Sequence, residues 1–189
     1  MKKIFLVVSL CIAMMSCEKE SPYLIDKNKI GAVTGNTTMS EIESLFPNDS
    51  LVKTNLSNRF NTKKQDLEIY NKNRELIAVL EPRKNGDSTS TFKQARLMGA
   101  EFKTKKGLGP KATFKDIYEN YTISSIQNAI SNVIVSVDEL GMYVSINKKH
   151  LPSEIRYDVD LTIEANQIPD DAPFQFFWLS FEEEAKENK

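Results

Sequence analysis

The sequence predicts an α+β fold, in which an antiparallel sheet is built from two repeated helix-then-strands halves and completed by two additional C-terminal strands. Three observations predict it. Two helix-like segments lie 75 positions apart, glycine turns precede both, and runs rich in strand-forming residues follow both. Because each helix and each strand has an apolar side, packing the helices on one face of a single sheet buries these sides together.

The first half is predicted to begin with a helix over residues 38–46. Thr38 can cap its first turn, and Glu41 stands three positions later, as in a capping box. Gly31 and Gly35 precede the helix and permit a tight turn. The apolar stripe of this helix consists of Met39, Ile42 and Phe46. The strand segments that follow lie near residues 50–55, 67–69 and 76–80.

The second half repeats this order. Thr113 and Asp116 form the second capping pair, and Gly107 and Gly109 supply the turn before it. Its stripe consists of Phe114, Ile117 and Tyr121, and its strand segments lie near 124–129, 133–137 and 142–146. The predicted hairpin turns, 71–74 and 139–141, fall in equivalent places. We interpret the likeness as an internal duplication; the alternative is a chance resemblance between two short amphipathic helices.

Two closing strands are predicted near the C-terminus. Residues 158–164 alternate strictly between polar and apolar, so one face of this strand should be buried and the other exposed to solvent. Residues 174–181 are apolar on both faces, which predicts a strand that is covered on both sides or one on which a partner docks. The sequence leaves open whether these aromatic residues belong to the core or to an interface.

The N-terminal segment has the order of an export signal. Two lysines precede an apolar run from residue 4 to residue 15, and Ser16 and Cys17 follow it. The run is too short to cross a bilayer core of ~30 Å as a helix. The segment resembles the signal peptide and lipobox of bacterial lipoproteins, in which this cysteine becomes the diacylated N-terminus. The alternative is an ordinary secretory signal cleaved near Ala13, which leaves Cys17 as a free thiol.

These features predict the organisation of the chain. The predicted parts are a signal peptide (1–16), a lipidated N-terminus with a flexible tether (17–29), a single α+β domain (30–182) and an acidic tail (183–189). Within the domain we expect repeat halves at about 30–103 and 104–152 and closing strands in 153–182. The charged residues 18–20 resemble the tag that Bacteroidota place behind lipidated cysteines. We therefore expect an exported protein that its lipid holds on the outer membrane, on the periplasmic side or at the cell surface.

The whole pattern resembles the small uncharacterised lipoproteins of Bacteroidota in which a helix-plus-strands unit is duplicated. The resemblance rests on the lipobox, the two glycine–threonine helix starts and the turn at residues 166–170. It implies a folded domain attached to a membrane, and it supplies no catalytic residues.

Composition argues against several classes of function. Of 25 basic residues, Lys2 and Lys3 leave with the signal, so 23 face 26 acidic ones; the formal charge of −3 predicts no nucleic-acid partner. His150 is the only histidine, and lipidation consumes the remaining cysteine, so nucleophile–histidine systems and zinc sites lack residues that they need. We predict no catalytic residue, no metal and no cofactor. The crowded acids Asp158, Asp160, Asp170 and Asp171 fit an ordinary surface better than a calcium site.

Two kinds of candidate site remain. The second glycine turn, with lysines around it, could bind a carboxylate or phosphate at the helix start; the residues concerned are Lys105, Lys106, Gly107, Gly109 and Thr113. The alternative is a purely structural turn. Ser50 and Ser88 lie in short Asp-Ser-Leu and Asp-Ser-Thr segments that resemble O-glycosylation acceptors of Bacteroidota.

The predicted function is that of a membrane-anchored, non-catalytic binding or structural module, whose partner is the membrane through the lipid and, beyond it, an envelope protein or a glycan such as peptidoglycan. The alternative is a small envelope hydrolase that uses Asp and Glu carboxylates. The sequence leaves the ligand and the oligomeric state open.

Overall fold

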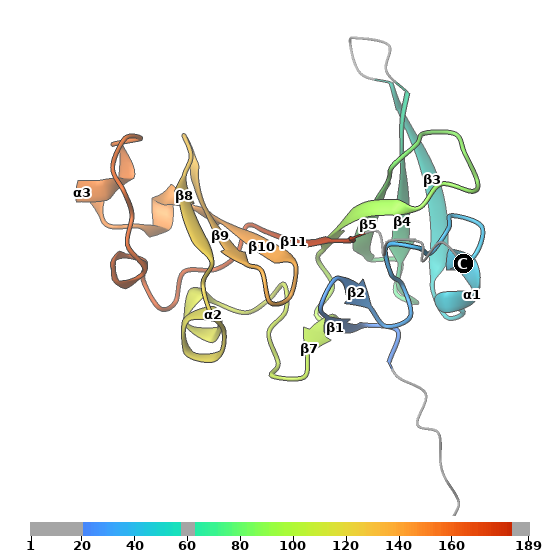
Figure 1. Cartoon of the computed structure of the whole chain (residues 1–189), viewed down its shortest axis with the longest axis horizontal. Helices are drawn as coiled ribbons and strands as arrows, with labels where there is room; N and C mark the ends of the chain where they lie inside the picture. Colours follow the sequence, from blue (N-terminus) through green and yellow to red (C-terminus); the bar gives the residue numbers. More distant parts are fainter. Residues whose placement is uncertain (1–20, 58–62, 183–189) are drawn as a thin grey trace, which may run out of the picture.

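An eight-stranded antiparallel sheet and a smaller three-stranded sheet dominate the computed structural model of the protein, which describes residues 21–57 and 63–182 (Figure 1). The strands of the large sheet, in spatial order, are β3 (Ser50–Ser57), β4 (Lys63–Tyr70), β5 (Leu76–Pro82), β6 (Phe92–Leu97), β11 (Phe176–Ser180), β10 (Met142–Asn147), β9 (Asn132–Val137) and β8 (Ser125–Asn128). The small mixed sheet consists of β2 (Lys29–Ile30), β1 (Leu24–Asp26) and β7 (Lys103–Thr104). The fold is therefore mostly β.

The helices are short. They are α1 (Ile42–Leu45), α2 (Phe114–Asn120) and α3 (Ser153–Arg156), with 3₁₀ turns η1 (Lys148–His150) and η2 (Ala165–Gln167). In Figure 1, α2, the small sheet and α1 lie along the lower side of the large sheet. This side is the covered face of the large sheet, and we call the opposite side the open face.

The covered face carries the hydrophobic core. The strand register joins one residue from every strand into a single apolar row, which consists of Ile126, Val135, Val144, Phe177, Leu97, Ala78, Ile69 and Leu51. From Val135 to Ile69 these side chains are at most 1% exposed. An unbroken apolar row across antiparallel strands fixes the register, because a slip by one residue would turn every side chain to the other face.

The first predicted helix is much shorter than the sequence pattern suggested. Met39 and Ser40 donate their backbone N–H groups to the carbonyls of Ser90 and Ser88, so the chain runs beside that loop before it can turn into a helix. Pro47 follows the single turn of α1 at once. The predicted apolar stripe is nevertheless correct, since all three of its residues are buried.

The second predicted helix is confirmed. Thr113 donates its hydroxyl and its backbone N–H to the Asp116 carboxylate, at 3.2 and 2.8 Å, and these two residues form a capping box at the start of α2. Both predicted hairpin turns are also present, between β4 and β5 and between β9 and β10.

The prediction of a strand at residues 158–164 is wrong. The N–H of Asp160 bonds to the Asp158 carboxylate at 2.9 Å, and the Asn128 amide donates to the carbonyls of Asp158 and Leu161. These side-chain bonds compete with a strand ladder. Residues 153–182 therefore contain one closing strand, β11, instead of the two predicted.

The folded part begins earlier than residue 30. Ile25 in β1 is 1% exposed, and Tyr23 packs its ring on Phe46 and Phe102 with centroids 6.2 and 5.5 Å away. Residues 24–29, which the sequence placed in the tether, belong to the small sheet and to the turn between β1 and β2. The tail 183–189 lies outside the described residues.

No helix in the two described ranges is long and apolar enough to cross a membrane.

Candidate functional site

The open face of the large sheet gathers aromatic and polar side chains where β10, β11 and β6 lie side by side. The register places Tyr143 opposite Trp178, and Trp178 opposite Arg96. Phe176 lies on the same face, two positions before Trp178. We call Tyr143, Trp178, Arg96 and Phe176 the aromatic patch. Phe176 is 37% exposed and the other three are half-buried, so a ligand can reach them.

A stack of rings and one cation organises the aromatic patch. Tyr143 and Trp178 lie with their ring centroids 6.1 Å apart and their planes 12° from parallel. The Arg96 guanidinium carbon is 5.8 Å from the Trp178 ring centroid and 5.9 Å from that of Phe176. Such cation–π contacts hold the guanidinium in place and leave its edge donors available for a ligand.

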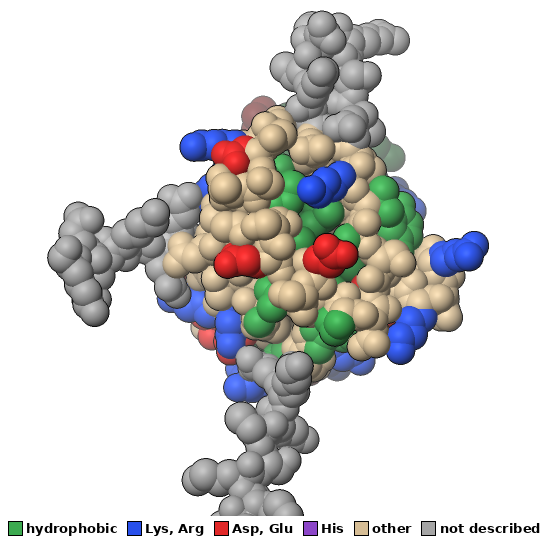
Figure 2. Space-filling model, turned by 90° about the vertical axis from the view of Figure 1, so that its right-hand side faces the viewer, with side chains coloured by type: hydrophobic (Ala, Val, Ile, Leu, Met, Phe, Trp, Pro, Cys, Tyr) green, Lys and Arg blue, Asp and Glu red, His purple; other side chains and the backbone are tan. Residues whose placement is uncertain are grey.

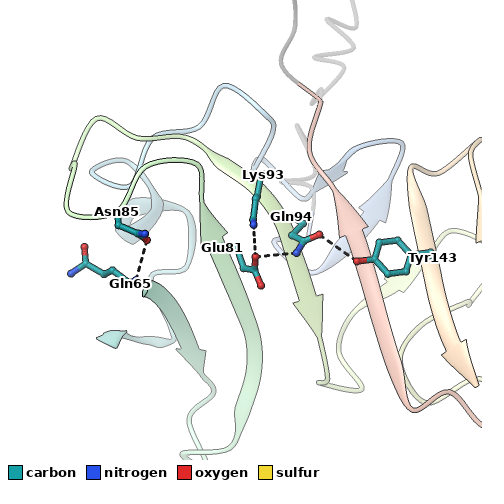
Figure 3. A network of polar contacts seen from close by, with 6 residues as sticks. All are labelled: Gln65, Glu81, Asn85, Lys93, Gln94 and Tyr143. Carbon is teal, nitrogen blue, oxygen red and sulfur yellow. Dashed lines mark hydrogen bonds and ion pairs between the residues drawn. The ribbon is translucent and has the colours of Figure 1, made fainter. Parts of the chain in front are cut away.

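A polar network borders the aromatic patch (Figure 3). The Gln94 amide donates to the Glu81 carboxylate at 3.0 Å, and Lys93 forms an ion pair with the same carboxylate at 2.9 Å. The Tyr143 hydroxyl donates to the Gln94 carbonyl oxygen at 3.3 Å. One chain of contacts thus joins β5, β6 and β10 and fixes the direction in which the Gln94 amide points.

The surroundings of Tyr143 change the pKa of its phenol. Burial raises the pKa of its phenol, and the nearby negative charge of Glu81 raises it further. The hydroxyl is therefore a neutral hydrogen-bonding group at physiological pH.

Ser145 gives the patch a buried polar group that is not satisfied. It lies opposite Phe176 on the open face and is 6% exposed. Its hydroxyl has no hydrogen-bond partner within the described residues.

A hollow of 670 Å³ adjoins the patch at the ends of β5 and β6. Its lining includes Ile77 and Met98, with Glu75, Glu101 and Lys111 among the charged residues. Extending the β11–β6 register by one residue brings Phe176 opposite Met98. The patch and the hollow therefore meet at this edge of the open face.

The residues of the predicted anion site lie close in sequence but do not converge on one hollow. Gly107 and Gly109 line a hollow of 170 Å³ together with Lys103, Lys111 and Asp116. The Asp116 carboxylate already accepts the bonds of the helix cap there. Lys106 instead donates to the Asn120 carbonyl at 2.6 Å and lies 4.6 Å from the Tyr121 ring centroid. Lys105 is exposed, and Thr113 caps α2. Anion binding stays a prediction.

The remaining predicted positions can also be placed. Ser50 begins β3 and is exposed, and Ser88 is exposed in the loop between β5 and β6. Glycosylation of either serine stays a prediction. His150 lies in η1 and lines a hollow with Lys149 and Phe174. Cys17 lies outside the described residues.

Carboxylates come together at one further place. Asp138 and Glu182 line a hollow of 220 Å³ with Ser136, Tyr143 and Ser180. The hydrolase alternative can use this hollow or the 670 Å³ hollow, which Glu75 and Glu101 line. Within residues 21–57 and 63–182, His, Cys, Asp and Glu form no group of three or more that could hold a metal ion.

The structure answers the question that the sequence left open about residues 174–181. Phe177, Leu179 and Phe181 point into the core and are at most 3% exposed, whereas Phe176 and Trp178 lie on the open face. Sequence reasoning singled out this strand but missed its partners, Arg96 and Tyr143. Their only signal was their place in short strand-like segments, and the pairing of those strands cannot be read from the chain.

No protein-family model matches the sequence, and no curated protein matches it. The fold is similar to that in the crystal structure of the uncharacterized protein yfeY from Escherichia coli, with a TM-score of 0.55 and 12% sequence identity. The similarity covers 83% of this chain and 99% of that one. At this level of identity the likeness shows a shared fold alone.

Proposed function

We propose that the protein is a non-catalytic envelope lipoprotein, anchored to the outer membrane through Cys17, whose aromatic patch binds a glycan. The combination of Trp178, Tyr143 and Phe176 with Arg96 and Gln94 on one face is the observation that carries the proposal. Sugar rings have apolar C–H faces that pack on aromatic rings, and their hydroxyls bond to amide, carboxylate and guanidinium groups. An aromatic surface with a few fixed polar groups is a common form of small-ligand site.

The position of the first strand supports this arrangement. β1 lies in the small sheet, on the covered side of the large sheet (Figure 1). A chain that enters from Cys17 therefore reaches the domain from the side opposite the aromatic patch. The membrane would then lie against the covered side, and the patch would face away from the bilayer.

Co-sedimentation tests the proposal. Purified full-length protein in detergent is mixed with insoluble peptidoglycan sacculi and, separately, with immobilised outer-membrane polysaccharide. We expect one of these to retain the protein, and the double variant Phe176→Ala/Trp178→Ala to lose retention. Tyr157→Ala is the matched control, since Tyr157 is 81% exposed and lies outside the aromatic patch. Equal retention of the wild type and the double variant, or capture of a protein partner alone, would contradict glycan binding at this face.

We also propose that the two halves arose by duplication. Supporting this, α1 is followed by a meander of β3, β4 and β5, and α2 by a meander of β8, β9 and β10. Each meander is extended by one more strand, β6 or β11, and these two strands pair at the centre of the sheet. The aromatic patch lies partly at this junction, where residues from both halves meet.

A small hydrolase is the second candidate, and the hollow shared by Asp138 and Glu182 is the observation that favours it. Two carboxylates in one hollow could act as acid and base on a glycosidic bond. Release of reducing ends from the retained glycan, abolished by Asp138→Asn, would favour the hydrolase over the binding module.

A further inference from the structure

We propose that a lysine-rich surface on the covered side docks on the anionic lipid headgroups of the membrane that holds the anchor. This surface consists of Lys27, Lys103, Lys105 and Lys111, all of them exposed, and we call it the lysine surface; Lys111 stands at its border, because it also lines the hollow beside the aromatic patch. The inference rests on the lipid anchor of the proposed function and adds an orientation of the domain on its membrane.

The lysine surface has an unusual charge pattern. Residues 102–113 contain no acidic residue and four lysines, namely three of the lysine surface and Lys106, although acidic residues outnumber basic ones in the whole chain. By contrast, the end of the molecule that carries α1 and β3 mixes positive, negative and apolar side chains, as Figure 2 shows. A polybasic segment of this kind is attracted to anionic lipid, and the attraction falls off within the Debye length of about 8 Å at physiological ionic strength.

The acidic groups around the lysine surface have other partners. Asp26 lies 3.8 Å from Lys29, and Glu101 accepts a hydrogen bond from Asn71 at 3.0 Å. Asp116 accepts the bonds of the α2 cap. These bonds leave the charges of Glu101 and Asp116 in place, so both carboxylates offset part of the lysine charge, but within the described residues none of the four lysines forms an ion pair.

The lysine surface lies beside the strand into which the anchored end leads. Lys103 is the parallel partner of Leu24 in β1, and its N–H bonds to the carbonyl of Tyr23 at 3.3 Å. Lys27 lies in the turn between β1 and β2. An anchor that enters through β1 therefore brings these lysines near the bilayer, together with the residues that Tyr23 contacts.

The length of the chain before β1 sets how far the domain can move away. Six steps separate Cys17 from Tyr23, and an extended chain spans at most ~3.6 Å per step, so the reach is about 20 Å. Tyr23 itself is fixed, because its hydroxyl donates to Asp49 at 2.8 Å and its ring packs on two phenylalanines. A tether this short keeps the lysine surface at a high effective concentration near the headgroups, so weak attractions are sufficient for docking.

Lysine footprinting on vesicles tests the proposal. Full-length acylated protein is reconstituted into phosphatidylcholine vesicles with or without phosphatidylglycerol, treated with an amine-acetylating reagent, and each lysine is quantified by mass spectrometry. On the anionic vesicles we expect acetylation of the lysine surface to fall several-fold and to recover at high salt. Lys53, Lys72 and Lys149 are exposed elsewhere and serve as internal controls.

Charge-reversal variants supply the second arm. In Lys103→Glu/Lys105→Glu/Lys111→Glu, protection of Lys27 should disappear, whereas in Lys53→Glu/Lys72→Glu/Lys149→Glu it should persist. If the protein is acylated but its lysine surface is acetylated equally on both kinds of vesicle, the docking proposal is wrong and the anchor proposal stands. If the intact mass of the mature protein shows no acyl chains, both the docking proposal and the lipid anchor on which it rests are wrong.

Discussion

Tyr143 and Trp178 stack on adjacent strands, with ring planes 12° from parallel and centroids 6.1 Å apart. Arg96 continues the stack onto the next strand, 5.8 Å from the Trp178 ring centroid. Because cross-strand pairs stabilise a sheet, this stack strengthens the centre of the fold and presents the same side chains to a ligand.

Substitutions on the two faces of β11 should affect different properties, namely stability on the core side and glycan binding on the open face. Phe177 is 1% exposed in the core, so Phe177→Ala should lower the free energy of unfolding by about 3–5 kcal/mol. Phe176 is 37% exposed, so Phe176→Ala should cost under about 1.5 kcal/mol but weaken glycan binding. Urea denaturation checks the first quantity and co-sedimentation the second. A larger loss of stability from Phe176→Ala would mean that this face is core.

Removal of the cation in the aromatic patch should separate binding from stability. Arg96→Gln deletes the guanidinium donors and two cation–π contacts, so we expect glycan retention to be lost while the free energy of unfolding falls by about 0.5–2 kcal/mol. Arg74→Gln, at an exposed turn residue, is the matched control. Unchanged retention in Arg96→Gln would remove Arg96 from the site.

The raised pKa of Tyr23 predicts a loss of folding stability at alkaline pH. Burial and the hydrogen bond to Asp49 raise the pKa of Tyr23 to about 12, whereas an unfolded tyrosine titrates near pH 10. The fold thus favours the neutral phenol, and the contribution of this group is fully present below pH ~10 and is lost as the pH rises toward ~12. Tyr23→Phe should therefore show a smaller fall in stability across this window than the wild type does. Chemical denaturation at several pH values measures the difference, and identical slopes would show that Tyr23 is not coupled to folding.

Replacement of the buried Lys148 by an apolar residue should stabilise the fold. It is 3% exposed, and its amine has no hydrogen-bond partner in the described part of the chain. Burial of an amine without a partner is costly, so Lys148→Met should raise the free energy of unfolding by about 1–3 kcal/mol. Lys149→Met, at an exposed neighbour, should change it by less than about 0.5 kcal/mol. A destabilised Lys148→Met would show that the amine is needed where it lies.

The local patterns predicted the second helix and the hairpins correctly, but they overestimated the length of the first helix and predicted a closing strand at 158–164 that is absent. Thr113 and Asp116 act within a single turn, so their spacing was sufficient. At residues 38–46 the predicted pair also forms, since Thr38 donates its N–H and hydroxyl to the Glu41 carboxylate at 2.9 and 2.8 Å, but long-range bonds to Ser88 and Ser90 leave only a short helix. At 158–164 the alternation was misleading because Asp158 and Asn128 satisfy the backbone through side chains.

The aromatic patch could be predicted only in part. The alternating faces of residues 174–181 indicated a surface, but Arg96 and Tyr143 come from strands 82 and 35 positions away from Trp178. Their approach depends on which strands pair at the centre of the sheet, β6 with β11 and β11 with β10, and that pairing is set by tertiary packing.

Trp178 is the only tryptophan in the chain, so its fluorescence reports directly on the proposed glycan site. The most direct test titrates full-length protein with soluble peptidoglycan fragments and with oligosaccharides released from the outer membrane. The proposed function predicts a saturable change in Trp178 emission with one of these ligands, abolished in Arg96→Gln and retained in Arg74→Gln. If a ligand that co-sedimentation shows to be bound left Trp178 emission unchanged, the site would lie elsewhere and the central claim would be wrong.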